Sequence, residues 1–110
     1  MVKLRYRLAT TAESGAHTEG EVLHVVSQNK LAISHCVADA WRRGERMTGK
    51  MEVRIELASN GNVTSANILS DRFVNTILGG CVARRVMEWR FPESGKGNTI
   101  VVPFILEATL

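Results

Sequence analysis

The chain has 110 residues, of which 45% are apolar and 23% are charged, and its formal net charge is +3. This composition is typical of one globular domain and excludes collagen-like, low-complexity and disordered classes. No apolar run approaches the roughly 20 residues that a membrane-spanning helix needs. Two cysteines are too few for a disulfide scaffold or for a four-cysteine zinc site.

The N-terminal residues lack the apolar stretch of about 7–15 residues that a signal peptide needs. We therefore expect either a cytosolic chain or a piece of a longer exported or membrane-anchored protein. Residues Lys3 to Leu8 alternate between polar and apolar side chains, as a strand does. Residues 1–17 are predicted to be a linker or an extra edge strand, and residues 18–110 to be the domain.

The first helix is predicted to begin after Thr18, which forms a capping-box pattern with Glu21, and to end at Gly44. Gln28 and Asn29 in its middle leave room for a kink or a break. Its apolar residues recur at helical spacing: Val22, Leu23, Val26, Leu31, Ile33, Cys36, Val37, Ala40 and Trp41.

Two strands joined by a tight turn are predicted next. From Lys50 the apolar period becomes two, which indicates a strand with one buried face. Asn60-Gly61 is the strongest short hairpin signal, and Val63 to Leu69 is the returning strand. The apolar positions of the first strand are Met51, Val53, Ile55 and Leu57.

A second helix is predicted after Ser70, which serves as its cap, and Pro92 ends the element. Gly79 and Gly80 each cost about 1 kcal/mol relative to Ala in a helix, so close packing is expected there. Thr99 to Glu107 is the last strand. The apolar positions of the helix are Phe73, Val74, Ile77, Leu78, Cys81, Val82, Val86 and Trp89.

The resulting order, α-β-β-α-β, predicts a two-layer α+β fold with two helices on one face of a three-stranded antiparallel sheet. The hairpin makes the first two strands antiparallel, and a right-handed crossover brings the third strand beside the first. The third strand is then an edge, which agrees with Pro103, because proline is tolerated on edge strands and scarcely in central ones.

Several segments carry a family resemblance when they are taken in order. The hairpin from Gly49 to Ser70 and the later Trp89-Arg90-Phe91 resemble the C-terminal domain of TonB. Further segments resemble, more specifically, the AgmX/PglI C-terminal domain, a TonB-like domain of bacterial gliding-motility and envelope proteins. They are Cys36-Val37, Gly80-Cys81-Val82, Phe91-Pro92 and Val102-Pro103-Phe104. The resemblance covers residues 18–106. The chain departs from the family pattern at Cys36-Val37, where that family commonly has a Cys-Tyr pair.

The resemblance implies a periplasmic, non-enzymatic protein–protein interaction domain without a cofactor. It would form the C-terminus of a larger protein anchored in the inner membrane, which explains the missing export signal. Its partners would be outer-membrane or cell-wall proteins, with no nucleic acid and no small-molecule substrate.

Three interpretations of the cysteines remain open. Cys36 and Cys81 fall on the apolar sides of two helices that should pack on one sheet. We expect a disulfide between the helices, and the alternatives are plain buried thiols and a metal or catalytic pair. A disulfide would need an oxidising compartment, which the resemblance implies.

No catalytic or metal-binding set is predicted. His24 and His35 lie about three helical turns apart, which is too far for both to bind one ion. His17 does not lie at a metal-ligand spacing from either of them. His35 and Cys36 are helical neighbours about 100° apart, so they do not form a nucleophile–base pair. Ser94-Gly95-Lys96-Gly97 lacks the strand–loop–helix setting of a phosphate loop.

Two functions from different classes follow. The first is protein binding at the exposed edge of the third strand by strand addition, although Pro103 would limit pairing to one half of it. The predicted contact residues are Ile100, Val101, Val102, Phe104, Ile105 and Leu106. The chain's own Leu4 to Leu8 would be a competing occupant of that edge.

The alternative is a cytosolic nucleic-acid-binding α+β module that uses two arginine clusters. Both clusters fall where a helix is predicted to end, and there cations complement the helix dipole. The clusters are Arg42, Arg43 and Arg46, and then Arg84, Arg85 and Arg90.

Overall fold

The computed structural model describes residues 2–6, 10–11 and 19–108. The strands are β1 (Val2–Tyr6), β2 (Thr10–Thr11), β3 (Gly49–Leu57), β4 (Val63–Ile68) and β5 (Asn98–Ala108). The helices are α1 (Glu19–Gln28), α2 (Lys30–Arg42) and α3 (Ile77–Val86). The predicted α-β-β-α-β order is confirmed, with the first helix in two pieces and two short strands before it. The predicted cap at Thr18 lies outside the described residues.

The break between α1 and α2 falls at Asn29, inside the predicted weak region. The Asn29 side-chain amide donates to the carbonyl oxygen of Val25 at 2.8 Å, and its backbone N–H is shared between the carbonyls of Val25 and Val26. Such side-chain competition for backbone groups interrupts helices. Leu31, which was named among the apolar residues at helical spacing, is 69% exposed. The α2 residues that are buried are Ile33, Cys36, Val37 and Ala40.

The hairpin of β3 and β4 forms as predicted, with the apolar side chains of β3 buried on one face. Its turn needs a glycine at Gly61, where φ is +90°. A Cβ atom at that position would also collide with the backbone carbonyl of Phe91. The turn is thus fitted to the segment that follows α3, since the Phe91 N–H donates to the Gly61 carbonyl at 2.9 Å.

Helix α3, which corresponds to the second predicted helix, begins later than predicted. Thr76, not Ser70, caps α3: its hydroxyl oxygen accepts from the Gly79 N–H at 2.9 Å. The Ser70 hydroxyl instead accepts from the backbone N–H of Glu52 on β3 at 3.0 Å. Because the chain turns before Thr76, Val74 and Ile77 do not share the buried helical stripe and are 42% and 37% exposed.

The strands form one antiparallel sheet in the order β1-β5-β3-β4, and β2 also pairs with β5. The predicted position of the third strand beside the first is confirmed, since β5 pairs with β3 from Gly49↔Leu106 to Leu57↔Asn98. The extra strands β1 and β2 lie along the other side of β5. They place residues of the predicted linker or edge strand in the sheet.

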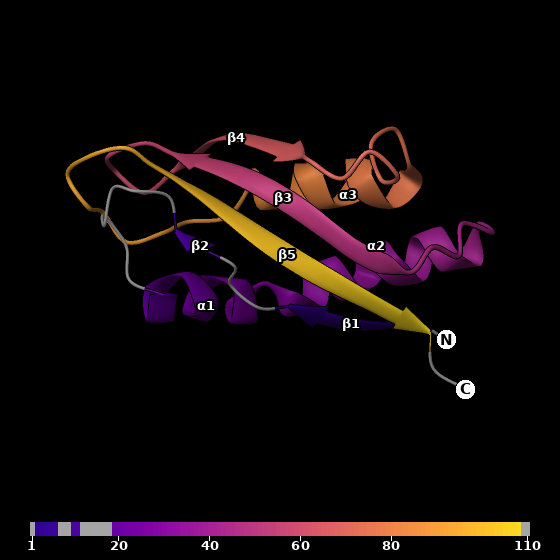
Figure 1. Cartoon of the computed structure of the whole chain (residues 1–110). Helices are drawn as coiled ribbons and strands as arrows, with labels where there is room; N and C mark the ends of the chain where they lie inside the picture. The colour runs from indigo at the N-terminus through magenta and orange to yellow at the C-terminus, as the bar shows by residue number, and fades with distance from the viewer. Residues whose placement is uncertain (1, 7–9, 12–18, 109–110) are drawn as a thin grey trace.

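The helices pack against one face of this sheet, and α2 and α3 lie side by side beneath it (Figure 1). The core lies between the two layers. No helix in the described part of the chain is long and apolar enough to cross a bilayer. The largest fully buried side chains are Phe73, Phe104, Ile33, Met51, Ile55, Ile100 and Leu106.

Candidate protein interaction site

The strand predicted as a binding edge, Ile100 to Leu106, is not an exposed edge. β1 pairs with it from Val2↔Ala108 to Tyr6↔Phe104, and β2 pairs at Thr10↔Val101 and Thr11↔Ile100. The predicted edge is therefore occupied by the chain's own N-terminal residues; Leu8 itself lies outside the described residues. The side chains that face the core and are at most 1% exposed are Ile100, Val102, Phe104 and Leu106, while Val101 and Ile105 are half-buried on the opposite face.

Pro103 lies between the stretch of β5 that pairs with β1 and the stretch that pairs with β2. Hydrogen-bonded pairs alternate along an antiparallel ladder, and the Leu69 N–H donates to the Glu52 carbonyl at 2.9 Å across β4 and β3. Even-numbered residues of β3 therefore bond to β4, and its odd-numbered residues bond to the even-numbered residues of β5. The odd-numbered residues of β5 then point their backbone N–H and C=O groups toward β1 and β2. Pro103 has no N–H to donate there. The register shifts by one residue between β1 and β2, and no described residue lies opposite Pro103.

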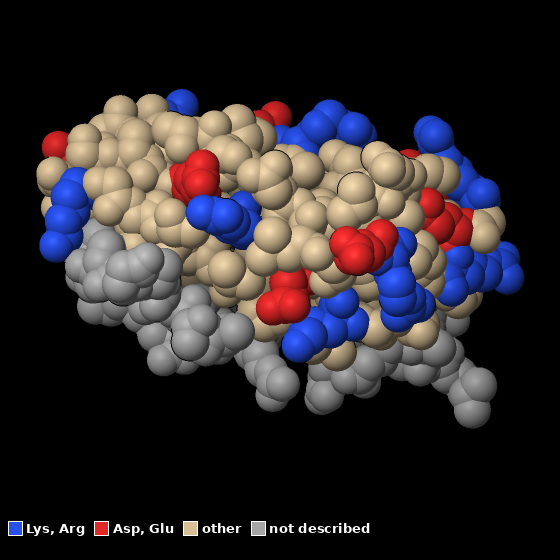
Figure 2. Space-filling view, turned by 45° about the horizontal axis from the view of Figure 1, so that its top comes forward, with Lys and Arg blue, Asp and Glu red and all other residues tan. Residues whose placement is uncertain are grey.

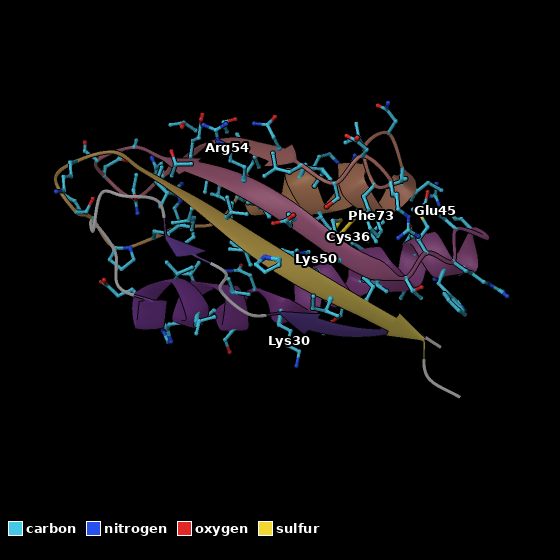
Figure 3. All side chains as sticks on the ribbon, viewed as in Figure 1. Lys30, Cys36, Glu45, Lys50, Arg54 and Phe73 are labelled. Atoms are coloured by element: carbon cyan, nitrogen blue, oxygen red, sulfur yellow. A yellow bond between two sulfur atoms is a disulfide. The ribbon has the colours of Figure 1, made fainter. Side chains whose placement is uncertain are left out.

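The two cysteines form a disulfide, with an S–S distance of 2.04 Å. Cys36 is fully buried on α2, and Cys81 is half-buried on α3. Figure 3 shows the bond between the two helices behind the sheet. Of the three interpretations of the cysteines, the disulfide is the one that the structure shows, and the bond joins α2 to α3.

The arginines at the end of α2 are held by local partners. Arg42 and Arg43 both lie within 4 Å of the Asp39 carboxylate, at 2.7 and 3.4 Å. The hydrogen bond from Arg42, opposed in part by desolvation and aided by the charge of Arg43, lowers the pKa of Asp39 below its usual 3.8. Arg46 lies over the ring of Trp41 at 4.8 Å. All three arginines of this first cluster therefore have a partner on α2 itself.

The sequence did not predict one structural contact, in which Glu45 caps the start of α3. The carboxylate of Glu45 accepts hydrogen bonds from the backbone N–H groups of Ile77 and Leu78, each at 2.8 Å. Glu45 caps a helix that begins 32 residues later in the sequence. No local pattern could signal this contact, because capping motifs are recognised only between neighbouring residues.

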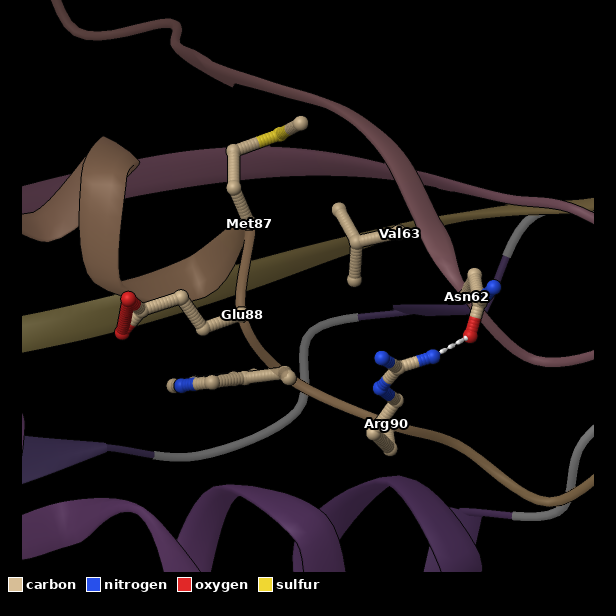
Figure 4. Close-up of a pocket in the computed structure, with 6 residues that line it drawn as sticks. Asn62, Val63, Met87, Glu88 and Arg90 are labelled. Carbon is tan, nitrogen blue, oxygen red and sulfur yellow. Dashed lines mark hydrogen bonds between the residues drawn. The ribbon is translucent and has the colours of Figure 1, made fainter.

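A shallow hollow of about 170 Å³ lies where the end of α3 meets the start of β4. Val63 and Met87 face it from the two elements, and the Arg90 guanidinium donates to the side-chain oxygen of Asn62 at its rim (Figure 4). Trp89 forms part of its lining and is 2% exposed. The indole Nε1 of Trp89 is buried without a hydrogen-bond partner among the described residues.

The described residues assemble no metal centre, since no three His, Cys, Asp or Glu side chains among them are grouped to hold an ion. His24 and His35 are exposed, and His17 lies outside the described residues. The fold and its disulfide define a small α+β domain whose notable surfaces are the edges of its sheet. No protein-family model matches the chain, and no curated protein matches it significantly.

Proposed function

We propose that the chain is a non-enzymatic protein–protein interaction domain that binds extended partner segments by strand addition. We place it in the periplasm, as the C-terminal part of an envelope protein that is anchored in the inner membrane and serves gliding motility or TonB-like energy transduction. The resemblance to the TonB and AgmX/PglI C-terminal domains motivates this assignment.

The pairing of β1 with β5 is the observation that carries the proposal. Five consecutive residues, Val2 to Tyr6, lie antiparallel along β5 in one register. In strand addition, the main-chain hydrogen bonds of a sheet edge supply affinity, and alternate side chains supply specificity. The chain's own segment therefore occupies β5 as a partner segment would, and a partner would bind by replacing it.

The Cys36–Cys81 disulfide supports the proposed compartment. Disulfides persist in the bacterial periplasm and are rare in the cytosol, where thiols are kept reduced. The bond is compatible with a domain outside the cytoplasm. Thiol alkylation of the protein in intact cells, followed by mass spectrometry, tests this: the proposal expects no free thiol, and two free thiols would contradict it.

Cross-linked capture from an envelope extract tests the binding role. A chain of residues 12–110 lacks β1 and β2, so it should capture the partner several-fold better than the whole chain does, and excess peptide of residues 1–11 should compete. Val101→Pro in the shortened chain removes the N–H that faces Thr10 and should abolish the gain. Equal capture by both chains, without competition by the peptide, would contradict the proposal.

Nucleic-acid binding has less support. The first arginine cluster is engaged with Asp39 and Trp41, and Arg54 on the outer sheet face is paired with Glu56 at 3.3 Å. A nucleic-acid surface usually gathers positive charge on one face. A measurable affinity for DNA or RNA that falls steeply with salt would revive this alternative.

A further inference from the structure

The sheet has a second edge, formed by β4, which no strand among the described residues covers. β4 has a strand neighbour only on the β3 side among the described residues. Because Asn67 and Leu69 fall on the hydrogen-bonded positions of the β3–β4 ladder, Ala66 and Ile68 turn their backbone N–H and C=O groups away from β3. These groups are a template for one further strand.

The open edge lacks most of the usual protection. Edge strands generally carry proline, charged side chains or bulges that prevent pairing with other chains. β4, with the sequence Val-Thr-Ser-Ala-Asn-Ile, has no proline and no charge. A register shift opposite the step from Glu56 to Leu57 disturbs its beginning, so the regular stretch is residues 65–68.

One flank of α3 borders this edge. Cys81 turns the other flank of the helix toward α2, and at about 100° per residue Ala83 and Met87 lie more than a quarter turn away from it. α3 packs directly against β4, and Met87 shares the hollow with Val63, the first residue of β4. Met87 is 45% exposed, so this flank is small and apolar and accessible from solvent.

Arg84 and Arg90 lie beside the same groove, whose hollow is also lined by Glu88. The Arg84 guanidinium leans back over Gly80, to within 3.5 Å of where a Cβ atom would lie, and Arg90 is bound to Asn62 at the start of β4. Among the described residues, no carboxylate lies within 4 Å of Arg84 or Arg90, whereas Arg85 has Glu88 at 3.9 Å. Figure 2 brings the β4 side forward and shows basic side chains along its upper and right-hand outline, with acidic side chains among them.

We infer that the groove between the β4 edge and α3 binds an extended, acidic segment of a partner protein. The main chain of the segment pairs with Ala66 and Ile68, its apolar side chains lie over Ala83 and Met87, and its carboxylates bind Arg84 and Arg90. A second copy of this chain fits less well, because β4 carries no acidic residue to offer these arginines. The inference rests on the proposed protein-binding role but uses the edge opposite to the one held by β1.

A displayed library of random eight-residue peptides, selected against the oxidised whole chain, tests the inference. We expect the selected peptides to be rich in Asp and Glu, and to slow amide hydrogen exchange at Ala66 and Ile68. Arg84→Glu should weaken their binding at least tenfold. Lys30→Glu, an equal charge reversal at an exposed position on α2, should leave it unchanged. Ala66→Pro removes an outward N–H and should abolish binding, while Ala66→Val keeps the N–H and the binding.

Each of the following results would overturn the inference. They are recovery of no binding peptide, binding that is indifferent to Arg84→Glu, and protection of Ala66 and Ile68 without peptide at concentrations where the chain dimerises. The last result would assign the edge to a second copy. Peptides that protect only Val101 and Ile105 would overturn the β4 assignment but leave the proposed function standing, because those amides face β1 and β2.

Discussion

Glu45 accepts a hydrogen bond from Leu78, which lies 33 residues later in the sequence. Its Oε1 accepts the Leu78 N–H at 2.8 Å, and its Oε2 accepts the Ile77 N–H at the same distance. The first N–H groups of a helix have no partner within the helix, and the dipole favours negative charge at that end. The loop after α2 is thereby fastened to the start of α3. This contact and the disulfide thus connect α2 and its following loop to α3 at two points.

We predict that Glu45→Ala lowers the free energy of unfolding by about 1–2 kcal/mol, because two backbone N–H groups lose a charged acceptor. Glu45→Gln keeps one acceptor oxygen and should cost about half as much. Urea unfolding followed by circular dichroism measures both variants. Glu93→Ala, at an exposed position, is the matched control, and a Glu45→Ala effect no larger than that of the control would contradict the capping role.

Loss of the disulfide should destabilise the domain strongly. The bond closes a loop between residues 45 apart, and the chain-entropy model gives about 4 kcal/mol for such a loop. The double variant Cys36→Ala/Cys81→Ala should lose about 2–4 kcal/mol, and dithiothreitol should lower the melting temperature of the native chain but not that of the variant. If reduction leaves the melting temperature of the native chain unchanged, the stabilising role of the bond is wrong.

Gly79 and Gly80 should respond in opposite ways to alanine. A Cβ atom at Gly79 would collide with the Phe73 carbonyl, whereas one at Gly80 would meet only the flexible end of Arg84 at 3.5 Å. Gly79→Ala should cost about 1–3 kcal/mol, and Gly80→Ala should gain up to about 1 kcal/mol from helix propensity. Thermal unfolding compares the two variants; equal effects would show that the close contact at Gly79 is absent.

The pKa of Asp39 should lie below 3.8 in the folded protein and rise toward that value in Arg42→Ala, since the Arg42 hydrogen bond is the main cause of the shift. A lowered folded-state pKa stabilises the folded state above the unfolded-state pKa, and this stabilisation is lost as the pH falls through the folded-state pKa. The stabilisation is therefore fully present above about pH 4, and only its loss is expected at lower pH. An NMR titration of the Asp39 carboxyl checks the prediction, and an unchanged pKa in Arg42→Ala would contradict it.

Local patterns predicted the elements whose residues contact close neighbours. The period of two from Met51 to Leu57 and the Asn60-Gly61 turn specify the hairpin, and both appear in the structure. The start of α3 was predicted wrongly, because Ser70 is as good a cap as Thr76 by sequence and only the backbone of β3 decides between them. Such choices depend on tertiary contacts that no local window contains.

The candidate edge was predicted in part. The order of elements places β5 at one side of the three-stranded core, and alternation in the N-terminal residues suggested a strand that could cover it. Propensity cannot decide whether that strand pairs, because pairing depends on long-range backbone contacts. For the same reason the sequence did not point to the proposed role of β4, because its edge stands out only when β5 is known to be covered.

Strand addition to β5 is the central claim, and a titration of the 1–11 peptide into labelled residues 12–110 tests it most directly. Two-dimensional NMR with hydrogen exchange should show saturable binding that newly protects the amides of Val101 and Ile105, which face the added strand. The amides of Val102 and Phe104 pair with β3 and should be protected before and after the peptide is added. Absence of saturable binding, or protection without this odd-and-even pattern, would contradict the account.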